Sequence, residues 1–360
     1  QRIVDEHREI TEHIAYLRGL LADKNLILGL IKEDLANIKD KFGDDRRTEI
    51  GYGMDSDFNM EDLIREEDVF VSITQRGYAK RTPVTAYRQQ ARGGKGLLGM
   101  STRDEDELEH MFTAGTHNSI LFFSDYGKVY SIKAYEIPEM DRTAKGTNLM
   151  NILPLMPEEK ITAAVPVPNF DDAEFLTMIT RKGRIKRIGV QKFAHVRPSG
   201  LRALTLDGDD KLGWVKLTSG DQDLILVSEQ GKGIRFSEQD VRPMGRTAAG
   251  VNAMRLDDWD YIAGADVVTP DDDLLVITEK GYGKRTALDE YRQQNRYGQG
   301  VRAMVLEPER TGKIVGARVV TRGDEVTCIS SNGIILRTAS DFISKQGRTT
   351  QGVRIMDLRK

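Results

Sequence analysis

The chain has 360 residues, which exceeds the size at which one hydrophobic core stops growing, so we expect several modules or a repeat array. No apolar run reaches the roughly eighteen residues of a membrane helix, and the first thirty residues are charged, which excludes a spanning helix or a signal peptide there and predicts a cytosolic protein. A formal net charge of −3 argues only weakly against a nucleic-acid partner, because the charges are segregated along the chain.

Residues 1–42 carry a heptad pattern typical of a coiled coil. We expect two helices, or one with a joint near ADKN, with Asp23 capping the second helix and Gly43 ending it. The apolar seam is formed by Ile10, Ile14, Leu17, Leu21, Leu28, Ile31, Leu35 and Ile38. The chain contains no second heptad segment, so we expect the partner helix to come from another chain or from sequence missing here, and the chain to be a fragment.

Residues 43–67 are predicted to form an acidic linker. Charged and small residues are mixed there without a sustained period, although NMEDLIREED has room for one helical turn.

From residue 68 to residue 360 the sequence contains six repeats with a period near fifty residues, over residues 68–117, 118–172, 173–221, 222–271, 272–323 and 324–360. Each repeat opens with an apolar strand that ends in Ser or Thr. A glycine follows three residues later, at Gly77, Gly127, Gly183, Gly231, Gly281 and Gly333. We expect a tight hairpin at each of them, because the turn needs a positive φ that glycine adopts without a Cβ clash.

A second strand follows each hairpin, and a second glycine lies about nineteen residues after the first, at Gly96, Gly146, Gly200, Gly250, Gly300 and Gly352. The residues after it are predicted to form a third strand, and stretches such as ITAAVPV and YIAGADVV a fourth. Six units of four strands predict a mainly β, propeller-like disc with six blades. An open solenoid competes with the ring, but the repeats lack distinct polar end caps.

Motifs of catalysis and metal binding are largely missing. GGKG and TGKI do not complete a phosphate-binding loop, the five histidines are scattered, and DGDDK is too short for a calcium loop. Tyr78, Tyr87, Tyr282 and Tyr291 hold equivalent repeat positions, which suggests packing. The single cysteine, Cys328, lies in the apolar stretch VTCIS and is expected to be a packed side chain.

Cations recur in register around the predicted disc. An arginine lies four residues after the hairpin glycine in five of the six repeats, at Arg81, Arg187, Arg235, Arg285 and Arg337. Further cations in and near these strands complete a predicted rim: Lys80, Lys128, Arg184, Lys186, Lys284 and Arg296. Such a rim would meet successive phosphates of duplex DNA bent around the disc without reading its sequence. The competing interpretation is that the cations at the strand ends only keep the surface of the rim hydrated and bind no partner.

The loop QARGGKG at residues 90–96 resembles the glycine-rich box of the A subunit of DNA gyrase. Matching residues are Gln90, Arg92, Gly93, Gly94, Lys95 and Gly96, whereas Ala91 stands where a cation is usual, which weakens the expected contribution of that position. Glycines let backbone N–H groups approach a phosphate closely, so we expect the box to bind DNA. The segments FGDDRRTEI and EDLIREEDVFVSITQRGYAKRTPVTAYRQQ are similar to those that join the coiled coil of that protein to its C-terminal domain.

The resemblance implies the end of a coiled-coil arm over residues 1–42 and a six-bladed β-pinwheel that wraps DNA over residues 68–360. In that family the blades share strands, and the box lies where the first and last blades meet. The resemblance also implies an A2B2 enzyme, an ATP-dependent type II topoisomerase that introduces negative supercoils. The homodimer of A subunits would supply the cleaving tyrosine from an N-terminal region, and ATP and Mg²⁺ would act through the B subunits, so no catalytic residue, metal or cofactor is expected in this chain.

Two other interpretations stay open. The corresponding domain of topoisomerase IV has similar repeats, but its first repeat usually lacks an intact box, so the box favours gyrase. A protein-interaction propeller such as a WD-repeat disc is less favoured, because neither Gly-His nor Trp-Asp pairs recur.

Overall fold

The computed structural model describes residues 1–44, 60–86, 106, 108–141, 143–172, 174–330 and 335–358. The chain divides into two compact units, Gln1–Phe58 and Asn59–Lys360, and each is described by itself. None of the helices in these ranges is long and apolar enough to cross a membrane.

The first unit contains the two expected helices, α1 (Arg2–Ala22) and α2 (Lys24–Phe42). Asp23 separates them and caps α2, because its carboxylate accepts a hydrogen bond from the Asn25 N–H at 2.8 Å. Gly43 ends α2 with a φ of −66°, so it is not in the left-handed conformation, but a Cβ there would lie 2.3 Å from the Lys39 carbonyl oxygen. All eight predicted heptad residues are exposed. The partner helix for this seam stays a prediction.

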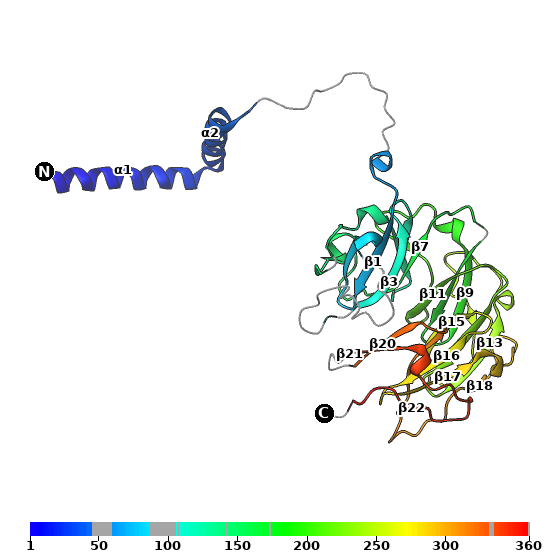
Figure 1. The fold of residues 1–360 in the computed structure, drawn as a ribbon. Helices are drawn as coiled ribbons and strands as arrows, with labels where there is room; N and C mark the ends of the chain where they lie inside the picture. Colours follow the sequence, from blue (N-terminus) through cyan, green and yellow to red (C-terminus); the bar gives the residue numbers. More distant parts are fainter. Residues whose placement is uncertain are drawn as a thin grey trace. The chain divides into compact units, whose positions relative to one another are not determined.

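The second unit is built of antiparallel sheets (Figure 1). The first sheet, in the order β3-β1-β2-β6, contains β1 (Asp68–Thr74), β2 (Tyr78–Pro83), β3 (Leu108–Gly115) and β6 (Thr147–Asn148). The second, β10-β5-β4-β7, contains β4 (Ser119–Ser124), β5 (Lys128–Lys133), β7 (Ile161–Val167) and β10 (Leu201–Arg202). The third, β11-β8-β9-β14, contains β8 (Phe175–Thr180), β9 (Arg184–Gly189), β11 (Leu212–Thr218) and β14 (Val251–Asn252).

The fourth sheet, β15-β12-β13-β18, contains β12 (Asp223–Ser228), β13 (Lys232–Ser237), β15 (Ile262–Val268) and β18 (Val301–Arg302). The fifth, β19-β16-β17-β22, contains β16 (Asp273–Thr278), β17 (Tyr282–Ala287), β19 (Ile314–Val320) and β22 (Val353–Arg354). Short 3-10 turns are η1 (Met60–Leu63), η2 (Val84–Ala86), η3 (Ala134–Glu136), η4 (Leu149–Asn151), η5 (Val190–Phe193), η6 (Glu238–Asp240), η7 (Leu288–Glu290) and η8 (Ser340–Phe342).

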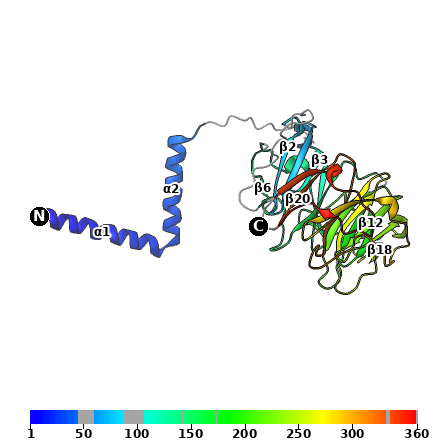
Figure 2. The same cartoon turned by 60° about the horizontal axis from the view of Figure 1, so that its bottom comes forward.

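The prediction of six four-stranded blades is wrong. The described residues form five four-stranded sheets, and the sixth repeat forms a two-stranded sheet of β20 (Glu325–Ile329) and β21 (Ile335–Ala339). In the second to sixth repeats, the strand after the second glycine is only two residues long and pairs with the sheet of the preceding repeat. The sixth repeat therefore gives its short strand, β22, to the fifth sheet and keeps a hairpin. Figure 2 shows β6 and β18, two of these transferred strands, with the sheets of β2 and β12.

The hairpin glycines adopt the expected conformation, with φ between 74° and 84° at Gly77, Gly127, Gly183, Gly231 and Gly281; Gly333 lies outside the described residues. The Ser or Thr three residues earlier closes the same turn. For example, the Thr180 hydroxyl accepts a hydrogen bond from the Arg184 N–H at 3.0 Å.

The cores lie between adjacent sheets. Ile120 and Phe122 of β4 pack toward the first sheet, whereas Leu121 and Phe123 pack toward the third. This alternation explains why the first strand of each repeat is a continuous apolar run, since both of its faces are buried. Cys328 of β20 is also buried, as expected.

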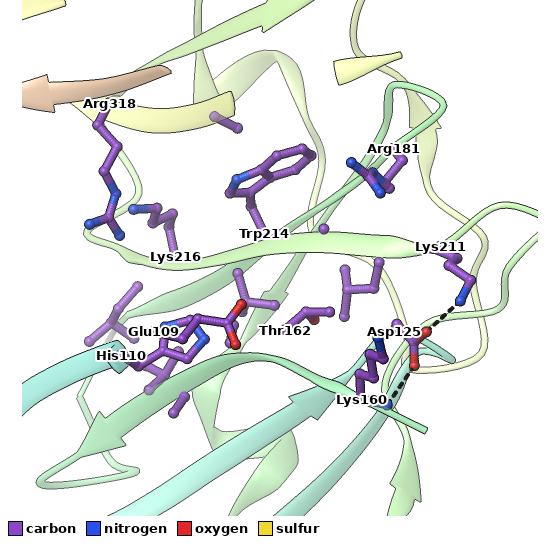
Figure 3. Close-up of a pocket in the computed structure, with 18 of the residues that line it drawn as sticks. Glu109, His110, Asp125, Lys160, Thr162, Arg181, Lys211, Trp214, Lys216 and Arg318 are labelled. Atoms are coloured by element: carbon purple, nitrogen blue, oxygen red, sulfur yellow. Dashed lines mark hydrogen bonds and ion pairs between the residues drawn. The ribbon is translucent and has the colours of Figure 1, made fainter. Parts of the chain in front are cut away.

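The last strands of the first five repeats, β3, β7, β11, β15 and β19, surround one central cavity of about 650 Å³, as in a propeller (Figure 3). Lys216 and Arg318 lie near His110 at one side, and Lys211 binds Asp125 at 2.6 Å at the other. Burial, together with the positive charges of Arg318 and Lys216, lowers the pKa of His110 to about 4. The folded unit therefore holds a neutral imidazole beside its central cavity.

Neighbouring blades are joined by the arginines that follow the hairpins. The side chain of Arg187 is 8% exposed; its Nε donates to the Val241 carbonyl at 2.8 Å, and its Nη1 lies 3.4 Å from the fully buried Glu238 carboxylate. Arg81 and Arg285 donate in the same way to the Ile137 and Ile343 carbonyls of the next repeat. Arg235 donates to the Leu288 carbonyl and pairs with Asp223 at 2.8 Å. These side chains therefore connect the first, third, fourth and fifth sheets to the following repeat.

Arg187→Met should lower the free energy of unfolding of the β unit by about 3 kcal/mol, because it leaves the Glu238 carboxylate buried without its cation. Arg337→Met is the matched control, since Arg337 is 54% exposed and pairs only with the exposed Glu325, and its loss should be below about 1 kcal/mol. Urea unfolding followed by tryptophan fluorescence measures both. Equal, small losses would show that the buried contacts of Arg187 do not stabilise the fold.

His110→Gln should flatten the dependence of stability on pH. The unfolded chain takes up a proton on this histidine below its ordinary pKa of 6.5, whereas the folded chain does so only near 4. The native protein should therefore lose up to about 2 kcal/mol of unfolding free energy from this group between about pH 7 and pH 5. His195→Gln, at an exposed position, should keep the native profile. If the unfolding free energies of the native protein and His110→Gln depend on pH in the same way, His110 is not held neutral in the folded unit.

Candidate nucleic-acid interface

The segment before each second glycine forms a loop at the outer edge of a sheet. These rim loops comprise residues 137–146, 191–200, 241–250, 291–300 and 343–352. Gly250 shows why a glycine ends them: its φ is 81°, and a Cβ would lie 2.4 Å from the Ile185 carbonyl oxygen of the preceding repeat. The glycine thus lets the loop lie directly against the neighbouring sheet.

Successive rim loops are linked into a belt. The loops at residues 241–250, 291–300 and 343–352 are each hydrogen-bonded to residues just after the short strand of the preceding repeat, which is the edge strand of its sheet. The Thr205 hydroxyl donates to the Thr247 carbonyl at 2.8 Å, and the N–H groups of Arg255 and Val305 donate to the Gly298 and Thr350 carbonyls at 3.0 Å. We call the rim loops from residue 191 onward, together with β10, β14, β18 and β22, the rim belt.

The rim belt carries exposed cationic charge. Within the described part of the chain, six exposed guanidinium groups of the belt have neither a hydrogen bond nor an ion pair: Arg197, Arg202, Arg242, Arg246, Arg292 and Arg302. Arg348 and Arg354 add positive charge to the belt but have protein partners: Arg348 donates to the Arg302 carbonyl at 3.2 Å, and Arg354 donates to the Tyr282 hydroxyl at 3.1 Å and lies 3.7 Å from the Asp357 carboxylate. Free guanidinium groups can bind phosphates bidentately without first breaking a protein contact.

Three lysines of the predicted rim point inward instead. Lys80, Lys186 and Lys284 are fully buried, and their ammonium groups donate to backbone carbonyls of the following repeat. Burial lowers the pKa of both Lys186 and Lys284 to about 8. Direct contact between these ammonium groups and DNA would require the loops above them to move away.

The other predicted rim cations differ in their surroundings. Arg81, Arg187, Arg235 and Arg285 are the inter-blade arginines, and phosphate contact would break those connections. Arg337 is exposed and paired with Glu325. Arg184 pairs with Asp207 at 2.7 Å and donates to the Gly250 carbonyl, while Arg296 donates to the Asp240 carbonyl at 3.3 Å. Lys128 lies 3.2 Å from the Met156 sulfur. The predicted box, Gln90 to Gly96, lies outside the described residues.

A sequence signal for the rim belt exists, but it sits at the second glycine rather than the first. An arginine lies four residues before that glycine in five of the six repeats, at Arg92, Arg142, Arg246, Arg296 and Arg348. Another lies two residues after it in three repeats, at Arg202, Arg302 and Arg354. The box arginine, Arg92, is thus the first member of a series that continues along the described belt.

The described residues contain no group of three or more His, Cys, Asp or Glu placed to hold a metal ion. The arrangement is that of a charged surface for a polyanion.

Comparisons with known proteins agree with this arrangement. The family model of the DNA gyrase C-terminal domain, a β-propeller, matches residues 68–114, 118–168, 174–219, 222–269, 272–321 and 324–360. The A subunit of DNA gyrase from Clostridium acetobutylicum is 46% identical over 99% of this chain, which spans 43% of that relative.

Two solved structures are similar to 82% of this chain at 28% identity. The C-terminal domain of DNA topoisomerase IV is matched over 90% of its length with a TM-score of 0.71. The DNA gyrase A C-terminal domain is matched over 97% of its length with a TM-score of 0.66. Because the family model covers all six repeats, the chain belongs to the family of the DNA gyrase C-terminal β-propeller domain, the non-catalytic part of the gyrase A protein.

Proposed function

We propose that the chain binds duplex DNA along the rim belt and wraps it around the β unit without sequence specificity. The observation that carries this proposal is the series of exposed arginines, free of protein partners, on hydrogen-bonded neighbouring blades. Phosphate contacts made from successive blades would fix the path of the duplex, whereas sequence recognition needs contacts to base edges.

In the whole enzyme, this wrapping would let gyrase introduce negative supercoils in an ATP-dependent reaction. Relatives over the whole chain are A subunits of DNA gyrase, so we place it in an A2B2 assembly, a homodimer of A subunits with two B subunits, in the bacterial cytoplasm. ATP and Mg²⁺ would act through the B subunits, outside this chain. The exposed seam of α1 and α2 would pair with a helix of the coiled-coil arm.

The corresponding role in topoisomerase IV is the second candidate, because a topoisomerase IV domain is among the similar structures. The box sequence at residues 90–96 favours gyrase. Supercoiling by the reconstituted enzyme distinguishes the two.

Replacing Arg246, Arg292 and Arg302 by alanine should weaken DNA binding and reduce the slope of log affinity against log salt by about three, since each lost phosphate contact releases about one counterion fewer. A triple variant of Lys280, Lys313 and Arg322 removes three exposed charges outside the belt and is the matched control. Fluorescence anisotropy with random-sequence duplexes at several salt concentrations measures both. If both triple variants lose the same DNA affinity, binding depends on overall charge, and the rim belt is not the DNA-binding surface.

Replacing Gly93, Gly94 and Lys95 by alanine should abolish supercoiling by the reconstituted enzyme while relaxation and decatenation persist. The substitutions remove backbone freedom and one charge from the box, but they leave the belt arginines and the catalytic parts of the enzyme unchanged. The three activities are assayed on one preparation. Supercoiling at the native rate would show that the box merely connects strands.

A further inference from the structure

Three buried lysines occupy one equivalent position, three residues after the hairpin glycine of the first, third and fifth repeats. They are Lys80, Lys186 and Lys284, and none of them is exposed to solvent. For Lys186 and Lys284, no carboxylate in the described residues forms an ion pair with the ammonium group. Removing a charge from water without a counter-charge is unfavourable, which agrees with the lowered pKa of both groups. Two buried ammonium groups at equivalent positions, both unfavourable for folding, call for another reason.

The acceptors of the Lys186 and Lys284 ammonium groups supply that reason, because they lie in the rim belt or directly beside it. Lys186 Nζ donates to the Arg246 carbonyl and to the Ala203 carbonyl, both at 2.6 Å. Ala203 directly follows Arg202 of β10. One buried ammonium group thus joins the backbones of two exposed belt arginines that come from different repeats.

Lys284 makes the same kind of contact one pair of blades further along. Its Nζ donates to the Gly347 and Arg348 carbonyls at 2.6 and 2.7 Å and to the Thr350 hydroxyl at 3.2 Å. Lys80 likewise donates to the Asp141 and Ala144 carbonyls in the rim loop of the second repeat. In two loops the carbonyl of a belt arginine is itself an acceptor.

The even-numbered repeats provide a natural comparison. The position of the lysine is taken there by Tyr130, Ile234 and Leu336. The rim loop at residues 291–300 therefore lies on Ile234, without a lysine beneath it. Its arginine, Arg296, donates its own side chain to the Asp240 and Asn252 carbonyls. This loop differs from the one over Lys186, where the guanidinium group of Arg246 has neither a hydrogen bond nor an ion pair within the described residues.

We propose that Lys186 and Lys284 are positioning residues for DNA binding, which hold the backbone of the belt arginines so that their guanidinium groups stay at the surface, where a phosphate can reach them. This inference rests on the proposed DNA binding by the rim belt. A preorganised loop loses less conformational freedom when it binds, so holding it should raise affinity without any direct phosphate contact.

The test is a mutant cycle on the full chain with a labelled random-sequence duplex. Lys186→Met should lower affinity about three- to tenfold, a loss typical of one or two side chains that must be ordered on binding. The salt slope should stay unchanged, because Lys186 itself touches no phosphate. In a background of Arg202→Ala and Arg246→Ala, the same change should cause no further loss, because the arginines through which it acts are gone.

Ile234→Met is the matched control, since it places the same side chain at the equivalent lysine-free position and should leave affinity unchanged. Thermal melting checks folding, and a Lys284→Met and Arg348→Ala cycle gives a second, independent test if Lys186→Met unfolds. If Lys186→Met lowers DNA affinity by the same factor in the arginine-free background, the lysine is purely structural. If it reduces the slope of log affinity against log salt by about one, the lysine is a direct phosphate ligand. Either result overturns the inference. If the variants with Arg202→Ala and Arg246→Ala bind DNA with native affinity, the proposed DNA binding by the rim belt is wrong, and not the role of the lysine.

Discussion

The transfer of one short strand from each of the second to sixth repeats to the sheet of the preceding repeat is the contact on which the rest of the β unit depends. It requires the chain to come back against a neighbouring blade. Gly146, Gly250, Gly300 and Gly352 permit the approach, because a Cβ there would meet a backbone carbonyl oxygen, and at Gly200 it would meet the Tyr130 ring. The rim loop before the transferred strand is therefore held between two repeats. This one constraint explains both the second glycine of every repeat and the continuity of the rim belt.

The same two residue types have opposite roles on either side of this contact. Beneath the rim loops, Lys186 and Arg187 are buried and donate to backbone carbonyls, where water is excluded and an unpaired acceptor would be unfavourable. On the outer side, Arg202 and Arg246 are exposed and keep their charge free. A cation in a low-dielectric contact stabilises structure, whereas one in water remains available to a polyanion. Whether a cation stabilises the fold or stays available to bind DNA is therefore decided by its position relative to the rim loop, and not by its residue type.

The centre of the unit is unlike its outer edge. The inner strands bring together charged groups of both signs and a neutral histidine, several of which bind each other. The mixed charge of the cavity contrasts with the positive rim belt, where six arginines have no hydrogen bond or ion pair within the described residues. DNA is therefore expected on the outer edge, where the short strands and rim loops lie.

The repeat pattern by itself determined much of the fold. Hairpin glycines, the strand runs, the break at Asp23 and the buried Cys328 depend on local backbone preference and burial, which a single sequence records. Tertiary structure alone decided which sheet each short strand joins, because pairing with the preceding repeat involves residues more than sixty positions apart, as for Val251 and Ile185. For the same reason the sequence could show that Arg187 and Arg246 recur, but not which of them faces solvent. That outcome depends on the neighbouring blade, which covers the first arginine and leaves the second exposed.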